Sequence, residues 1–403
     1  MTDSPLPDAR ATRMRWLEIL VAVIWVAGVI AATMQQGLSH PNNNFLIFRA
    51  ASQHLLHGQD LYAAYPLEHV DFYKYSPTFA LLFLPFALPP FLLSLLLWNT
   101  LNAVVLFVAL GAVLPRNAAT AARAIVFLDM LGSLQNVQSN ALVAALLILG
   151  FTAYERQHTV LGSLSTLIGT SIKVFPLAGA SFAIFHPRKL RVAIALAASF
   201  VALALAPLLV TSPSTLWSQY ASWRAIESAD ALERNLSIME HVQLLLRLDL
   251  PNWPLQLFGV AALVAPLLVR RDRWSEWTFR RLYLGSVLVF CVIFNHQAES
   301  PSFVIGATGA AVWFASLDRP TRWEWGLFVC FVVGTVLASS DAMPEWLQRN
   351  LFDPYRVKTL PLALLWIELQ RRLWHQRPER VPTTRSVEPA TERPTGGRRS
   401  SPH

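Results

Sequence analysis

The sequence predicts an all-α membrane protein that crosses the bilayer many times. Of its 403 residues, 54% are hydrophobic and only 14% are charged, whereas a soluble domain carries about 25% charged residues. The mean hydropathy is +0.40, and apolar runs recur along the whole chain. The net charge of +8 comes from Lys and Arg in short loops and in the tail. This pattern indicates membrane topology, and no nucleic-acid partner is expected.

The first apolar run, residues 16–34, follows Arg10, Arg13 and Arg15. It is long enough to span a bilayer, and no convincing signal-peptide cleavage site follows it. We therefore expect a retained first helix after a cytoplasmic segment, residues 1–15.

The membrane domain is expected to cover residues 16–372. A spanning helix needs roughly 20 apolar residues, and several runs are shorter, so some spans must be tilted, broken or buried in protein. The sequence predicts about twelve transmembrane helices, at 16–34, 90–114, 119–134, 138–154, 159–172, 174–186, 191–210, 253–269, 281–295, 302–317, 325–340 and 356–370. The pair 159–172 and 174–186 could instead be one bent helix and a re-entrant piece. Residues 77–88, which lie among four prolines, predict a short half-buried helix.

The distribution of positive charge predicts how these helices are oriented in the membrane. One side receives 24 of the 33 Lys and Arg residues, which predicts that both termini lie in the cytoplasm of a bacterial cell with an inner membrane. The outer connections are then the loops 35–76, 211–252 and 341–355 and the turns 134–139 and 295–301. The tail, residues 373–403, lacks apolar residues to pack and is expected to be a disordered cytoplasmic segment.

Two outer loops contain aromatic residues at near-helical spacing. Phe45 and Phe48 begin such a stripe in residues 44–57, and Trp217, Tyr220 and Trp223 recur every three residues. We expect short interfacial helices on the outer face at both places.

The loop at 40–77 concentrates polar and aromatic side chains and predicts one wall of an active site. Asp60, Glu68 and Asp71 are candidates for a general base, although a single loop acid is more often simply solvated. Tyr62 and Tyr75 could form an interfacial aromatic belt or could stack on a sugar ring.

Other connections add polar residues at the same membrane edge, and each has two interpretations. Gln138 and Asn140 could cap helix ends or could bind hydroxyl or phosphate groups of a ligand. His296 and Glu299 could be solvated loop residues or could belong to the site.

Lys173 lies between two apolar segments, with Pro176 shortly after it. It could extend its amine to the interface, or it could face a phosphate or an acid in a cavity at a broken helix. Asp129 could pair with Lys173 or shape the same cavity.

The sequence contains no Walker A, dinucleotide, HExxH or GxSxG motif. Cys291 and Cys330 both lie in apolar runs, so a disulfide framework or a cysteine metal site is not expected. No metal site is indicated.

Five short motifs, in this order, carry a family resemblance. They are Gly58–Tyr62 (GQDLY), Tyr73–Pro77 (YKYSP), Leu82–Pro85 (LFLP), Val137–Asn140 (VQSN) and Lys173–Pro176 (KVFP). Together they resemble glycosyltransferase family 87, a family of membrane enzymes of the GT-C type. The resemblance covers about residues 40–190, and the turn 294–303 also looks similar to one bacterial branch.

The resemblance implies a GT-C-like fold and a membrane hexosyltransferase without a cofactor. Its donor would be a polyprenyl-phosphate sugar, with a mannose-type hexose, and its acceptor a glycolipid or glycan at the periplasmic face. The donor chain would lie in a groove between spans, in contact with membrane lipids. Lys173, Lys74 or Arg49 would hold the phosphate. The remaining substrate-binding candidates are Asn44, Tyr62, Tyr75, Gln138, Asn140 and His296.

One position departs from the family pattern. The family has an Asp-Phe pair soon after the first span, and its Asp is the favoured base, whereas this chain has Asn44-Phe45. An amide cannot take a proton as a carboxylate does, so Asp71 is our first choice of base and Glu299 our second. Alternatively, the protein is a non-catalytic envelope-assembly protein. A transporter or lipid flippase is another alternative, but it would place polar residues along the membrane midplane from both sides.

Overall fold

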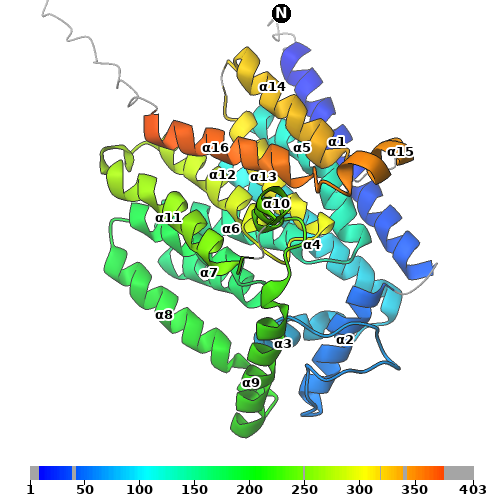
Figure 1. The fold of residues 1–403 in the computed structure, drawn as a ribbon. Helices are drawn as coiled ribbons and strands as arrows, with labels where there is room; N and C mark the ends of the chain where they lie inside the picture. The colour runs from blue at the N-terminus through cyan, green and yellow to red at the C-terminus, as the bar shows by residue number, and fades with distance from the viewer. Residues whose placement is uncertain (1–8, 39–41, 248–249, 318, 339–342, 376–403) are drawn as a thin grey trace, which may run out of the picture.

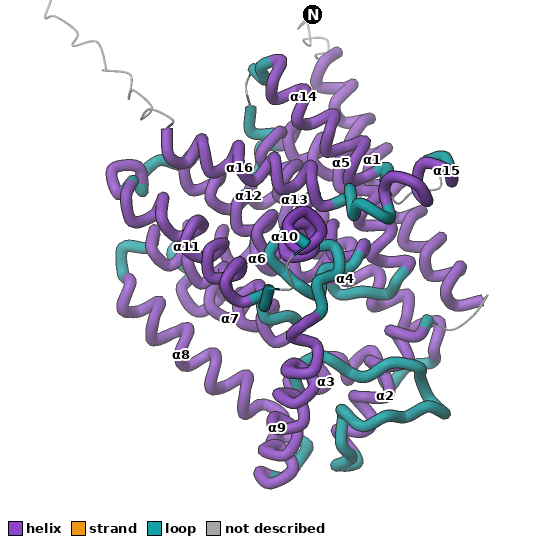
Figure 2. The backbone as a smooth tube through the Cα atoms, viewed as in Figure 1, coloured by secondary structure: helices purple, strands orange, loops and turns teal. Residues whose placement is uncertain are grey.

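The computed structural model describes residues 9–38, 42–247, 250–317, 319–338 and 343–375. All regular structure in these ranges is helical, as Figure 2 shows, which confirms the predicted all-α class. The predicted cytoplasmic N-terminus and disordered tail fall mostly outside the described residues.

The helices follow one another with short connections. They are α1 (Ala9–Leu38), α2 (Asn43–Leu56), α3 (Pro77–Ala87), α4 (Phe91–Val113), α5 (Arg116–Gln135), α6 (Asn140–Glu155), α7 (Thr159–Ile172), η1 (Phe175–Phe185), α8 (Lys189–Leu205), η2 (Ala206–Leu209), α9 (Pro213–Ala229), η3 (Asp230–Leu232), α10 (Ile238–Leu246), α11 (Trp253–Val269), η4 (Arg271–Arg273), α12 (Trp277–Ile293), η5 (Ser300–Ser302), α13 (Phe303–Phe314), α14 (Arg322–Phe331), η6 (Val332–Val336), α15 (Glu345–Leu347), η7 (Gln348–Phe352) and α16 (Thr359–His375). Each of the twelve predicted spans coincides with one or two of these helices.

Three described helical segments are long and apolar enough to cross a membrane, by length and composition: Thr12–Leu38, Phe91–Val113 and Lys189–Leu209. Only 28% of the most apolar stretch of the first and 17% of the last is buried. Their large exposed apolar faces are what a lipid-facing helix requires. The shorter helices α6, α12 and α13 are almost completely buried, so protein rather than lipid surrounds them.

The central helices α12 and α13 pack closely because glycines face each other. A Cβ atom added at Gly309 would lie 2.8 Å from the carbonyl oxygen of Gly285. Small residues at such a contact let two backbones approach. This pair forms the middle of the core that holds the functional region.

The chain is broken between α7 and η1. Lys173 has an extended backbone (φ −143°, ψ 142°), and Pro176 stands in the first turn of the 3₁₀ helix η1. The chain therefore forms two separate helices here, close to the predicted bounds 159–172 and 174–186. The break leaves Lys173 outside the regular helices on either side.

The predicted interfacial helices are α2 and α9, which lie at the lower end of Figure 1, away from the N-terminus. Gln219 of α9 connects α9 to the loop after α2. Its side chain accepts a hydrogen bond from the Leu61 N–H (3.0 Å) and donates one to the Gln59 carbonyl (2.7 Å). This buried amide fixes the loop that carries Asp71 and Lys74.

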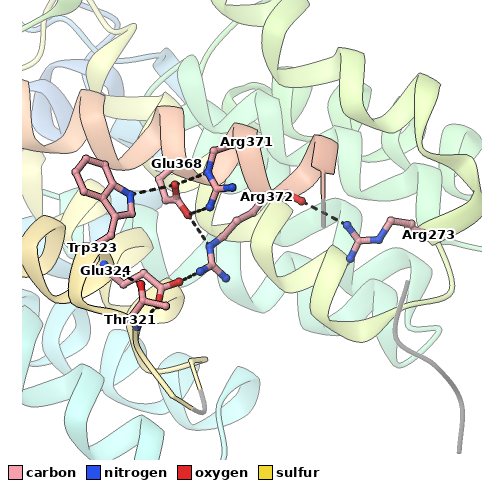
Figure 3. A network of polar contacts seen from close by, with 7 residues as sticks. All are labelled: Arg273, Thr321, Trp323, Glu324, Glu368, Arg371 and Arg372. Carbon is pink, nitrogen blue, oxygen red and sulfur yellow. Dashed lines mark hydrogen bonds and ion pairs between the residues drawn. The ribbon is translucent and has the colours of Figure 1, made fainter. Parts of the chain in front are cut away.

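A polar network joins α14, α16 and the segment before α12 (Figure 3). Glu324 and Glu368 are each 3% exposed, and both are ion-paired with Arg372. Arg273 donates to the carbonyl of Arg372 at 3.4 Å. Buried carboxylates need such partners, and the network ties the last helix to the bundle.

Candidate active site

A cavity of about 620 Å³ lies where several distant connections meet. Its walls come from α2 and the loop after it, the start of α6, the break between α7 and η1, the α9–α10 connection, α11 and the turn after α12. Eight predicted site residues line it: Asn44, Asp71, Lys74, Tyr75, Gln138, Lys173, His296 and Glu299. Side chains that are far apart in sequence thus surround one space.

Lys173, at the break after α7, and Glu299, in the turn after α12, both line the cavity. In the described part of the chain, neither the ammonium nor the carboxylate makes a hydrogen bond or ion pair. Burial lowers the pKa of Lys173 to about 8, and the negative charge of Glu299 acts in the opposite direction. Most Lys173 side chains are therefore protonated at pH 7 and carry a charge that an anion can use.

Lys74 is already paired. Its ammonium lies 2.8 Å from Asp230 Oδ2 and 3.7 Å from Glu233 Oε1. Burial opposes the charge, but the hydrogen bond and charge of Asp230 prevail and raise the pKa of Lys74. Gln297 also donates to Asp230 Oδ2 at 3.3 Å. Asp230 therefore joins three separate connections above the cavity.

Asp71 lies at the exposed rim of the cavity. Its carboxylate accepts a hydrogen bond from the Phe72 N–H at 2.7 Å. The preceding residue is fixed as well, because the Val70 N–H donates to Asn43 Oδ1 at 2.9 Å. Within the described ranges the other carboxylate oxygen accepts no hydrogen bond, and it lies at the edge of the site.

Amide side chains line the opposite wall. Gln138 is 5% exposed, and its Oε1 accepts a hydrogen bond from the Tyr75 hydroxyl at 3.2 Å. Its NH₂ group makes no hydrogen bond to a described residue, so it can contact a ligand. Asn44 instead donates to the Asn136 carbonyl at 2.9 Å, so at this position the chain has an anchored amide in place of an acid.

His296 forms part of the inner wall. Its Nδ1 lies 3.1 Å from Gln256 Nε2, and its Nε2 has no hydrogen-bond partner among the described residues. Burial lowers the pKa of His296, against the opposing charge of Asp230. The ring is therefore neutral at pH 7, and its unpartnered nitrogen can bind a ligand group.

Three predicted site residues lie away from the cavity. Arg49 donates to the Pro89 carbonyl at 3.0 Å and packs 5.9 Å from the ring of Phe91. Tyr62 is buried and donates to the Tyr75 carbonyl at 2.7 Å. Asn140 is fully buried, and neither polar atom of its side chain has a partner in the described ranges.

Asp129 does not pair with Lys173. It lies 3.8 Å from the ammonium of Lys358, at the start of α16. This pair supports the turn beside the cavity but does not line the cavity itself.

Two acids in the cavity wall were not predicted from the sequence. Glu227, near the end of α9, and Glu233, just after η3, both line the cavity. Burial raises the pKa of Glu227 and also that of Glu233, and Lys74 acts against the shift in each. The sequence could have indicated Glu227. It follows Trp223 by four residues, and residues at this spacing lie on the same face of a helix.

One end of the cavity is apolar. Leu177 of η1, Val260, Leu263 and Val264 of α11, and Phe290 of α12 line this part, which we call the apolar arm. Val260 and Leu177 are about half exposed, so the arm reaches the surface that faces outward between η1 and α11. An apolar chain can enter there from a lipid phase.

No group of three His, Cys, Asp or Glu side chains in the described ranges is arranged to hold a metal ion.

Comparison with known families places these residues in context. The sequence pattern of glycosyltransferase family 87 matches residues 72–294, more than half of the chain. The chain belongs to glycosyltransferase family 87. No curated protein matches the chain significantly. The match includes Lys74, Gln138 and Lys173 and extends through α9 to the end of α12, beyond the short motifs. Family membership and the apolar helices together indicate a multi-pass membrane protein of the glycosyltransferase type.

Proposed function

We propose that this protein transfers a mannose-type hexose from a polyprenyl-phosphate donor to a glycolipid or glycan acceptor. The reaction takes place at the periplasmic face of a bacterial inner membrane. The observation that supports this proposal is the joint cavity, which is lined by Lys173, by the apolar arm and by several carboxylates. The ammonium of Lys173 makes no hydrogen bond or ion pair to a described residue.

The donor fits the two halves of this cavity. Its isoprenoid chain lies in the apolar arm, and its phosphate contacts the ammonium of Lys173. A cation at this point stabilises the negative charge that develops on the departing phosphate. The free NH₂ group of Gln138 and Nε2 of His296 contact hydroxyl groups of the sugar.

The transfer needs one proton acceptor. The acceptor oxygen attacks the anomeric carbon while the bond from that carbon to the phosphate oxygen breaks. The acceptor's proton moves to a carboxylate, and polyprenyl phosphate leaves with the electron pair. Asp71 remains our first choice for this carboxylate because one oxygen is free at the rim. Glu299, whose carboxylate makes no hydrogen bond within the described ranges and whose charge acts on Lys173, is the second.

A direct assay tests the proposal. The purified protein is reconstituted into liposomes and supplied with radiolabelled polyprenyl-phosphate mannose and a mixed glycolipid extract. We expect label in a new glycolipid from the natural chain and none from Lys173→Met. Labelled donor that crosses a liposome membrane without a new glycosidic bond would instead support the flippase alternative. An intact donor on its original side would support a non-catalytic role.

A further inference from the structure

The polar part of the cavity contains more acids than cations. Asp71, Glu227, Glu233 and Glu299 line it, together with two cations, Lys74 and Lys173. These acids come from three separate connections of the chain, so the charge imbalance is a property of the cavity as a whole.

The two cations do not balance this charge. Lys74 is bound to Asp230 at 2.8 Å and to Glu233 at 3.7 Å, so one ammonium already serves two carboxylates. Lys173 is the remaining cation of the lining, and the donor phosphate uses it. At this end of the lining one ammonium thus serves two carboxylates, and Glu227 makes no ion pair within the described ranges.

Buried amides in the same wall indicate a polar ligand. Asn295 is 6% exposed, and its Oδ1 accepts a hydrogen bond from the Gln297 N–H at 3.0 Å. Its NH₂ group lines the cavity and makes no hydrogen bond within the described ranges. An amide N–H at the wall of a cavity can donate to an acceptor atom of a ligand, and a sugar hydroxyl offers one.

An aromatic face completes this part of the cavity. The indole N–H of Trp223 donates to the Lys74 carbonyl at 3.2 Å, which fixes the ring beside Glu227 on the same helix. A fixed indole can pack against a sugar ring or attract a cation through its π face.

We propose that the acceptor is a sugar with a protonated amine, bound between Trp223, Asn295 and the carboxylates of Glu227 and Glu233. This inference rests on the proposed transfer reaction and specifies its acceptor. The amine supplies the positive charge that the wall lacks, while its hydroxyls accept from the buried amide. An acidic headgroup is repelled by the same carboxylates.

The experiment compares three glycolipid acceptors that differ in one substituent: a free amine, its neutral N-acetyl form and a carboxylate. With the natural chain we expect kcat/KM for the amine to exceed that for the neutral form by about tenfold or more. The carboxylate form should be the poorest. The double variant E227Q/E233Q should lose this preference, whereas Glu345→Gln, on an exposed helix away from the cavity, should keep it.

Donor binding and thermal stability are measured on every variant, so that loss of folding is separated from loss of preference. Equal use of the amine and neutral acceptors, or an unchanged preference in the double variant, would overturn the inference and leave the proposed transfer intact. Failure to glycosylate any acceptor while the donor stays bound would instead contradict the transfer reaction itself.

Discussion

The ammonium of Lys358 lies 3.8 Å from Asp129 Oδ1, and both side chains are almost fully buried. The same ammonium donates to the Ser300 hydroxyl at 2.7 Å, and Ser300 directly follows Glu299. The pair therefore connects α5 and α16 to the turn that carries a candidate base. Removal of one partner leaves an uncompensated charge in the core.

We expect Lys358→Met to destabilise the protein by about 3–5 kcal/mol, the usual effect of breaking a buried ion pair. Thermal unfolding in detergent measures the change. The double variant D129N/K358M should recover part of the loss, because it removes both charges. As a control, Arg349→Met breaks an exposed pair with Glu345 and should change stability by less than about 1 kcal/mol. A K358M variant as stable as this control would contradict the structural role.

The choice of base can be decided by two amide substitutions. If Asp71 takes the proton, Asp71→Asn should reduce kcat by roughly 100-fold or more, while Glu299→Gln has a smaller effect. The reverse result would assign the base to Glu299. Donor binding should survive in both variants, since neither carboxylate is expected to hold the phosphate. Near-normal kcat in both would remove both candidates.

The charge of Lys173 should appear in the pH dependence of the reaction. The protonated form binds the donor phosphate, and burial lowers the pKa of Lys173 to about 8. The kcat/KM for the donor should therefore be highest below pH 8 and should fall as the pH rises through about 8. Lys173→Arg stays charged in this range, so its profile should be flat there. If kcat/KM of the Arg variant still fell near pH 8, the titration would belong to another group and not to Lys173.

The apolar arm makes a prediction about donor chain length. Val264→Trp should fill the arm and raise the donor KM by about tenfold, equivalent to about 1.4 kcal/mol. A short-chain donor analogue should be much less affected, because its chain does not extend into the arm. Leu257→Trp, on the exposed face of the same helix, is the matched control. Equal effects on long and short donors would place the isoprenoid chain elsewhere.

Local signals predicted the helices well. Prolines and apolar runs marked the ends of α3 and the break at Lys173, because these effects act within a few residues of the chain. Which runs are lipid-facing was not predictable in the same way. A buried segment such as α6 and an exposed one such as α8 are both apolar, and only packing distinguishes them.

The cavity was predictable in part. Polar residues at one predicted membrane edge suggested that Lys173 and Glu299 would meet, although 126 positions separate them in the chain. The partners of Lys74 were not foreseeable, since Asp230 and Glu233 come from a connection whose path depends on tertiary packing. Arg49 and Asn140 have suitable chemistry and lie close in sequence to residues of the cavity. Both nevertheless lie outside it, because tertiary packing decides where their side chains are placed.

The proposed orientation can be tested without knowledge of the reaction. Val70 is 94% exposed in the loop beside Asp71, so a cysteine at this position should react with an impermeant thiol reagent in whole cells. Cys330 is exposed and must first be replaced by serine, whereas Cys291 is buried. A cysteine in place of Arg156, at the end of α6 nearest the opposite edge, should react only after lysis. Labelling of position 70 only in lysed cells would reverse the topology, and the cavity would then open toward the cytoplasm, where a polyprenyl-linked donor on the outer leaflet could not reach it.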